Sequence, residues 1–171
     1  MNCPTRSNPH YEPNLQSLLT AFRTAKATHT HSNPNSALEI IHVFHASTSH
    51  ASPLHPAHPS HGTQPFAFAQ PAADGSEPVP WKSVNSSFIG TELERYLRAR
   101  DIRQLVVAGL TTDHCVSTTV RMAANLGVVD RRTGGFDAET VHAVSVASLE
   151  GESAEVMTTE EVVSALGSLG K

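Results

Sequence analysis

Residues 102–127, IRQLVVAGLTTDHCVSTTVRMAANLG, predict a strand, a polar turn and a helix in direct succession. The run 102–109 is apolar and rich in β-branched residues, which is typical of a buried strand. We expect the helix over residues 115–126, with Asp113 as its N-cap and Gly127 as its C-cap. A strand that leads straight into a helix is the repeating unit of α/β folds with a mainly parallel sheet.

The rest of the chain continues this alternation. We expect helices at residues 14–26, 141–149 and 158–167, a helix opened by a capping box at residues 91–94, and strands at residues 38–44 and 154–157. Residues 46–80 differ, because they hold seven of the eleven prolines, four of the eleven histidines and no Lys or Arg. We interpret them as a long irregular segment within one domain that spans residues 1–171.

The composition excludes several classes of function. The 171 residues carry 12 Lys and Arg against 16 Asp and Glu, a net charge of −4 at pH 7, without a basic stripe that could bind nucleic acid. No apolar run approaches the ~18 residues of a membrane-spanning helix, and no apolar leader follows Met1. Cys3 and Cys115 are too few for a disulfide framework, which indicates a reducing compartment. We therefore expect a cytoplasmic protein that binds neither nucleic acid nor membrane.

Cys115 is the first candidate for chemistry. It follows the C-terminal end of the expected strand and opens the next helix, and ligands of α/β sheets bind at that edge. The N–H groups at a helix N-terminus also stabilise a thiolate. The alternative is a small buried core residue, which is the common fate of a free cysteine.

Lys82 is the second candidate. It follows the long segment without basic residues, and its neighbours Trp81, Val84 and Phe88 are apolar. A lysine isolated in this way can orient a carboxylate or stabilise a nearby thiolate. The alternative is an ordinary surface lysine whose stem covers apolar neighbours.

The histidines of the middle segment suggest a metal site at first sight. They are His45, His50, His55, His58 and His61. Pro and Ser are interleaved with them, no cysteine or carboxylate lies nearby to complete a metal site, and the HExxH and CxxC spacings are absent. We interpret them as solvated loop residues and expect no bound metal. No GxGxxG or P-loop is present either, so we expect no cofactor.

The segment LVVAGLTTDHCVSTTVRMAANLG, residues 105–127, resembles the nucleophile segment of the isochorismatase-like cysteine hydrolases. That superfamily includes nicotinamidases and N-carbamoylsarcosine amidohydrolases. KSVNSSFIGTELERYL, from Lys82, is similar to the family's catalytic-lysine segment. VHAVSVASLEGESAEVMTTEEVVSAL, from Val141, is similar to its closing helix, strand and helix, and RSNPHYEPNLQSLLTAFR, from Arg6, to its first helix.

The resemblance implies a three-layer α/β/α sandwich and hydrolysis of an amide-type C–N bond in a small molecule. Cys115 would be the nucleophile and Lys82 its electrostatic partner. In the family the peptide bond that matches Leu110–Thr111 is cis, which turns the backbone N–H groups of Thr111 and Cys115 toward the oxyanion. Enol-ether hydrolysis, as in isochorismatase itself, is an alternative that does not use the cysteine.

Two features of the family pattern are missing from the sequence. Family members open with a strand of the type LLVIDVQ, whose aspartate is the general base, whereas no acidic residue precedes Glu12 here. One strand is also missing after Gly127, so we expect an incomplete sheet. Metal-binding members carry D-x-H where this chain has Phe44-His45-Ala46, so the resemblance implies no metal.

Two interpretations of these departures stay open. The chain is either an impaired hydrolase, as a truncated or alternatively spliced product would be, or an inactive homologue that acts as an oligomeric or binding scaffold. Unpaired sheet edges invite association, so we expect a homo-oligomer. We expect a small-molecule substrate in a pocket shaped by Asn85, Phe88 and the segment 46–80.

Overall fold

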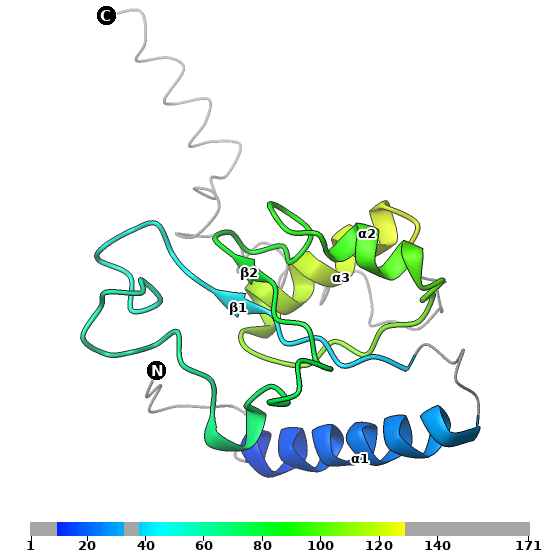
Figure 1. Ribbon diagram of the computed structural model, residues 1–171. Coiled ribbons are helices and arrows are strands. Elements are labelled where there is room, and N and C mark those ends of the chain that lie inside the picture. The colour runs from blue at the N-terminus through cyan, green and yellow to red at the C-terminus, as the bar shows by residue number, and fades with distance from the viewer. Residues whose placement is uncertain (1–9, 33–37, 129–171) are drawn as a thin grey trace, which may run out of the picture. The chain divides into compact units, whose positions relative to one another are not determined.

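A computed structural model describes residues 10–32 and 38–128 of the chain (Figure 1). The chain divides into two compact units, Met1–Arg131 and Arg132–Lys171, and every described residue belongs to the first unit. The elements expected at residues 141–149, 154–157 and 158–167 lie outside the described residues. Within the described part, no helix is both long and apolar enough to cross a membrane.

The first helix, α1 (Tyr11–Ser32), extends beyond both ends of the helix expected at residues 14–26. Its half-buried residues include Leu15, Leu19 and Phe22, which share one face of the helix. Two ion pairs tie α1 to later parts of the chain: Arg23 with Glu77 at 2.7 Å and Lys26 with Glu39 at 3.0 Å. The helix is therefore held by charged contacts as well as by its apolar face.

The sheet of the described residues has two parallel strands, β1 (Phe44–His45) and β2 (Trp81–Lys82). Phe44 lies opposite Trp81, with ring centroids 5.1 Å apart, and His45 lies opposite Lys82. The N–H of Ala46 donates to the carbonyl of Lys82 at 2.8 Å, so the pairing continues one residue past the end of β1. Parallel strands and helices in one unit are consistent with the expected α/β class.

The strand expected at residues 38–44 is confirmed only at its C-terminal end. The N–H groups of His42 and Phe44 donate to the carbonyls of Pro78 and Pro80, at 2.9 and 3.1 Å. These prolines have no N–H to donate in return, so the ladder loses half of its hydrogen bonds there. Two residues of regular strand are left at the end of an extended segment.

The strand expected at residues 102–109 is not formed, which corrects the prediction from its apolar run. The segment has no regular secondary structure, no described strand lies beside it, and no backbone hydrogen bond of a sheet reaches it. A strand needs a hydrogen-bonded neighbour, which apolar composition alone does not supply. Its side chains alternate, with Leu105 half-buried and Val106 66% exposed.

The helix expected after the capping box is confirmed as α2 (Leu93–Ala99). The hydroxyl of Thr91 accepts the N–H of Leu93 at 3.3 Å, which satisfies one N–H at the start of the helix. Glu94 pairs with Arg98 at 2.8 Å, one turn later on the helix surface, instead of closing the capping box. Only the threonine half of the predicted motif is therefore used.

The helix after Cys115 begins differently from the prediction. A π-helical turn, Thr112–Val116, leads into α3 (Ser117–Asn125). Asp113 lies inside this turn and is not the N-cap, which corrects the prediction. The predicted end is confirmed, since Gly127 follows the last turn with a φ of +63°. An added Cβ would meet nothing within 4 Å there, so the backbone conformation is what requires glycine.

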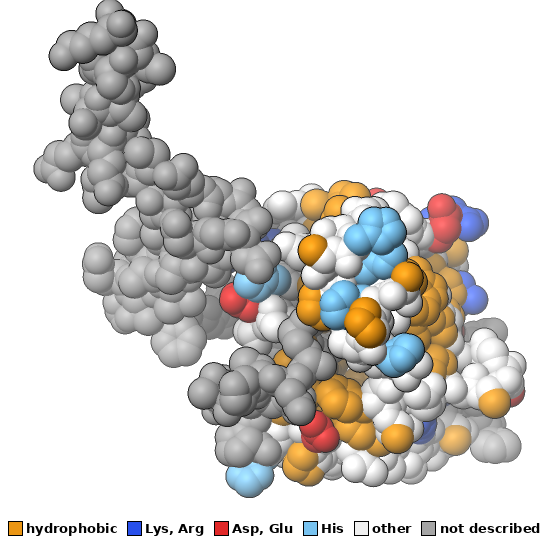
Figure 2. Space-filling view, turned by 90° about the vertical axis from the view of Figure 1, so that its left-hand side faces the viewer, with side chains coloured by type: hydrophobic (Ala, Val, Ile, Leu, Met, Phe, Trp, Pro, Cys, Tyr) orange, Lys and Arg blue, Asp and Glu red, His pale blue; other side chains and the backbone are white. Residues whose placement is uncertain are grey.

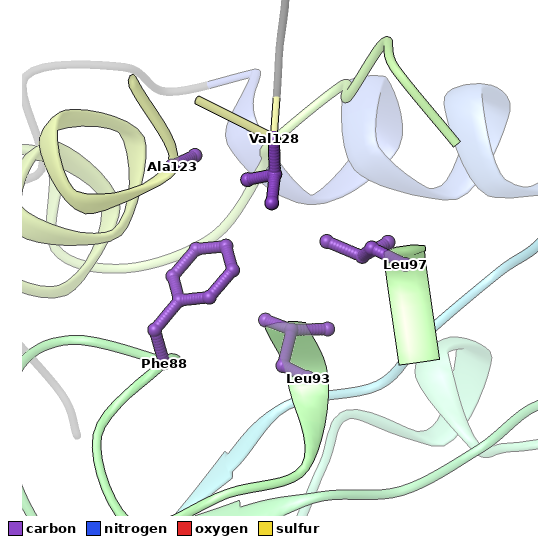
Figure 3. Close-up of a cluster of buried hydrophobic side chains, with 5 residues drawn as sticks. All are labelled: Phe88, Leu93, Leu97, Ala123 and Val128. Carbon is purple, nitrogen blue, oxygen red and sulfur yellow. The ribbon is translucent and has the colours of Figure 1, made fainter. Parts of the chain in front are cut away.

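The core of the described unit lies between α2, α3 and the loop that follows β2 (Figure 3). Its buried members are Phe88, Leu93, Leu97, Ala123 and Val128. Phe88, which the sequence assigns to the substrate pocket, packs here and is only 8% exposed. The same core anchors the loop after Lys82 and the helix after Cys115, and so fixes the two sides of the candidate site.

Candidate active site

Lys82 ends β2 and is buried, with 6% of its surface exposed. Its ammonium nitrogen has three hydrogen-bond partners. They are the Val84 carbonyl at 2.9 Å, Cys115 Sγ at 3.1 Å and His45 Nδ1 at 3.2 Å. A buried ammonium requires such partners, because its desolvation is costly otherwise. Lys82 is therefore an interior cation and not a surface lysine.

Cys115 lies in the π-helical turn that precedes α3 and is partly buried. Besides Lys82, its sulfur has Asn85 as a neighbour, with Oδ1 at 3.9 Å. The structure thus brings together Lys82, Cys115 and Asn85, three residues that the sequence selects. A thiol beside a buried ammonium is the arrangement that favours a nucleophilic thiolate.

His45 belongs to the same cluster, although its sequence context predicts a solvated loop residue. The strand register places it opposite Lys82, and its Nδ1 lies 3.2 Å from Lys82 Nζ. Burial and the positive charge of Lys82 lower the pKa of His45, so the neutral imidazole is favoured. The sequence does contain one indication of this role. His45 directly follows the expected strand 38–44, and ligand sites of parallel sheets form at the C-terminal ends of their strands.

The turn between residues 109 and 115 carries the expected backbone feature. The peptide bond between Leu110 and Thr111 is cis. Asp113 lies beside His114, with Oδ1 3.0 Å from Nδ1. Burial acts to raise the pKa of Asp113, but hydrogen bonds from Thr111 and the backbone and the nearby His114 outweigh it, so this pKa is lowered.

Of the other histidines of the middle segment, His50 and His61 are exposed and His55 and His58 are half-buried. The rings of His50 and His55 have centroids 4.1 Å apart, and His58 Nδ1 lies 2.8 Å from Ser60 Oγ. Figure 2 shows several histidine side chains, in pale blue, among hydrophobic ones on one face of the protein. No group of three or more possible metal ligands occurs in residues 10–32 and 38–128, and the expected absence of a metal stays a prediction.

The sequence of this chain matches a known protein family. The isochorismatase domain model matches residues 6–161. The uncharacterized isochorismatase family protein YrdC of Bacillus subtilis is 43% identical over 96 residues, which are 48% of this chain and 51% of YrdC. The match with this relative thus spans about half of its length.

Two solved structures have a similar fold. An isochorismatase-family structure from Chromobacterium violaceum superposes with a TM-score of 0.61 at 34% identity, covering 95% of this chain and 84% of that chain. A cysteine hydrolase from Pseudomonas syringae has a TM-score of 0.57, with 95% and 83% of the two chains covered. At 23% identity, this second likeness supports the fold alone.

The family match covers both Lys82 and Cys115, the two residues that meet at the end of β2. It also extends across both compact units of the chain. The resemblance found in the sequence is thereby confirmed, and the chain belongs to the isochorismatase family.

Proposed function

We propose that this protein is a cysteine hydrolase that cleaves an amide-type C–N bond of a small molecule. The observation that carries the proposal is the distance of 3.1 Å between Lys82 Nζ and Cys115 Sγ. An ammonium so close to sulfur favours the thiolate by Coulomb attraction, and burial of Lys82 strengthens that attraction. The resemblance to nicotinamidases and N-carbamoylsarcosine amidohydrolases supports the choice of a C–N bond.

In the proposed reaction, an electron pair of Cys115 Sγ attacks the carbonyl carbon and the C=O π bond opens to an oxyanion. We assign the oxyanion to the backbone N–H groups of Thr111 and Cys115, and removal of one such donor costs ~10²–10³-fold in rate in a well-studied protease. Collapse of the adduct breaks the C–N bond, and the amine leaves after taking a proton. Water then adds to the thioester, which releases the acid and restores the thiolate.

Both halves of this cycle need a group that moves protons. One proton goes to the leaving amine, and another must come off the attacking water. In the part of the chain that the structure describes, no carboxylate forms a hydrogen bond or ion pair with Lys82 or Cys115. We therefore propose a hydrolase with slow turnover. The alternative is an inactive homologue that serves as an oligomeric or binding scaffold.

The proposal extends to the layers of the fold, its sheet and its oligomeric state. We propose that the domain follows the three-layer sandwich of its family, with a sheet that is incomplete. Among the described residues the sheet has only the strands β1 and β2, and the absence there of a further partner strand supports association through an unpaired edge. We accordingly propose a cytoplasmic homo-oligomer that acts on a small molecule.

The test is to incubate the protein with a panel of primary amides and carbamoyl compounds. Mass spectrometry of the Cys115 peptide detects the thioester, and ammonia release measures turnover. We expect a stoichiometric acyl adduct followed by slow release, with both signals lost in Cys115→Ala. Turnover that survives Cys115→Ala would indicate a reaction without the thiol, such as enol-ether hydrolysis. A discrete, cooperatively melting oligomer that forms no adduct with any compound would favour the scaffold.

A further inference from the structure

The ammonium of Lys82 has as many hydrogen-bond acceptors around it as it has N–H groups. A lysine ammonium carries three N–H donors. Its three partners here are a carbonyl oxygen, a sulfur and an imidazole nitrogen, all within 3.2 Å. With the Val84 carbonyl and His45 taking one donor each, the remaining N–H is directed at Cys115.

We propose that His45 is a positioning residue that holds the Lys82 ammonium against Cys115. The proposal rests on the proposed function, because it gives His45 a part in preparing the same thiolate. His45 does this through Nδ1, which accepts one N–H of the ammonium and so fixes the rotation of the other two. Because Lys82 is buried, no bulk water stands ready to replace that acceptor.

The role requires a particular form of the imidazole. To accept from Lys82, Nδ1 must carry no proton, so the proton of the neutral ring resides on Nε2. The lowered pKa of His45 agrees with a neutral ring at physiological pH. Among the described residues, the titratable groups in hydrogen-bond contact with Lys82 Nζ are His45 and Cys115.

The backbone around His45 suits this role. His45 and Lys82 are register partners in the parallel sheet, and the N–H of Ala46 donates to the Lys82 carbonyl. The neighbouring pair, Phe44 and Trp81, packs edge to face in the same register. The two side chains of the proposed contact are therefore fixed by the strands and not by a flexible loop.

The test compares two substitutions that differ in one acceptor. In His45→Asn the amide oxygen occupies the place of Nδ1 and can still accept from Lys82, whereas His45→Leu removes the acceptor at similar volume. The readout is the pH profile of Cys115 alkylation by iodoacetamide, followed by peptide mapping. His55→Leu is the matched control, because it removes another half-buried histidine, whose Nδ1 accepts the N–H of Ala57 and not a proton of Lys82.

We expect His45→Leu to slow Cys115 alkylation at pH 7 by about tenfold, because the ammonium is no longer held against the sulfur. His45→Asn and His55→Leu should stay close to the unsubstituted protein. Equal profiles for the leucine and asparagine variants would overturn the proposal. If the leucine variant does not fold, nitrogen NMR of the unsubstituted protein decides, since a proton on Nδ1 would also overturn it.

This experiment separates the two proposals. The alkylation profile reports on the thiolate whether or not the protein hydrolyses any amide. A shifted profile in a protein without turnover would uphold the role of His45 and leave hydrolysis as the part that fails. If turnover depends on Cys115 but His45→Leu leaves the alkylation profile unchanged, the hydrolase proposal stands and the positioning role of His45 is wrong.

Discussion

Ser87 and Thr119 join the loop that follows Lys82 to the helix that follows Cys115. The Thr119 hydroxyl accepts the backbone N–H of Ser87 at 3.1 Å and lies 3.0 Å from its Oγ. Both residues are buried, at 5% and 6% exposure. The contact fixes α3 against the end of β2 and so determines how closely the lysine and the cysteine approach each other.

Thr119→Val should weaken both the fold and the site. The isosteric side chain leaves the buried N–H of Ser87 without its acceptor, which costs ~1–3 kcal/mol. Urea denaturation measures the loss, and iodoacetamide labelling of Cys115 should slow at neutral pH as the two sides of the site separate. Thr118→Val, at a half-buried position on the same helix, is the matched control. Equal stability of the two variants would contradict this account.

Lys82→Met should make Cys115 an ordinary thiol. The substitution keeps the buried stem and removes the charge that lies 3.1 Å from sulfur. Without that charge we expect alkylation of Cys115 at pH 7 to be slower in Lys82→Met than in the unsubstituted protein by about tenfold or more. Loss of the labelled peptide in Cys115→Ser identifies Cys115 as the reacting site. Equal alkylation rates of Cys115 in the two proteins would show that Lys82 does not activate the thiol.

The sequence predicted those parts of the structure that depend on residues close together along the chain. The helix around Leu93 and the glycine end of α3 follow from local caps and periodicity, and both are confirmed. The prediction of a strand at residues 102–109 was wrong, because strand formation depends on a partner strand elsewhere in the chain. His45 was missed for a similar reason, since its contact with Lys82 depends on a register set across the whole segment 46–80.

Glu77 should be the most stabilising carboxylate of the described unit. It is 4% exposed and bound by Arg23 through two hydrogen bonds, by His42 at 2.8 Å and by the N–H of Ala72. The hydrogen bond from Arg23 is the main cause that lowers its pKa to about 2, against the effect of burial. We expect Glu77→Gln to lower the free energy of unfolding at pH 7 by ~1–3 kcal/mol.

The effect of Glu77→Gln should depend on pH in a defined direction. A carboxyl whose folded-state pKa is lowered contributes fully above its unfolded pKa of about 4.3, and the contribution is lost as pH falls toward the folded value. The stability difference between the two proteins should therefore narrow from pH 5 to pH 3 in urea titrations. Glu92→Gln, in an exposed pair with Arg95, should change stability little at any pH. A stability difference between the unsubstituted protein and Glu77→Gln that stays constant from pH 5 to pH 3 would contradict the link between the Glu77 pKa and stability.

The ends of α2 and α3 offer a paired test of backbone strain. Both helices close with the same two hydrogen bonds, but the left-handed position holds Asp101 in one and Gly127 in the other, at φ of 50° and 63°. Gly127→Ala should therefore cost ~1 kcal/mol, and Asp101→Gly should stabilise by ~0.5 kcal/mol. The exposed pair of Asp101 with Arg103 offsets little of that gain. Thermal melts that move in the same direction for both variants would refute the argument.

Asp113 should not supply the proton transfers of the proposed reaction, although it is the carboxyl nearest to Cys115 in the sequence. Its contacts are with Thr111 and His114, and its lowered pKa makes it a poor proton donor at neutral pH. Loss of a general acid–base group typically costs ~10²–10⁴-fold, so a change well below tenfold in Asp113→Asn would place this residue outside the proton transfers. The measurements are the rates of acyl-adduct formation and of ammonia release, with Cys115 alkylation as the control for an intact site. A loss of ~10²-fold with unchanged alkylation would instead identify Asp113 as the missing acid.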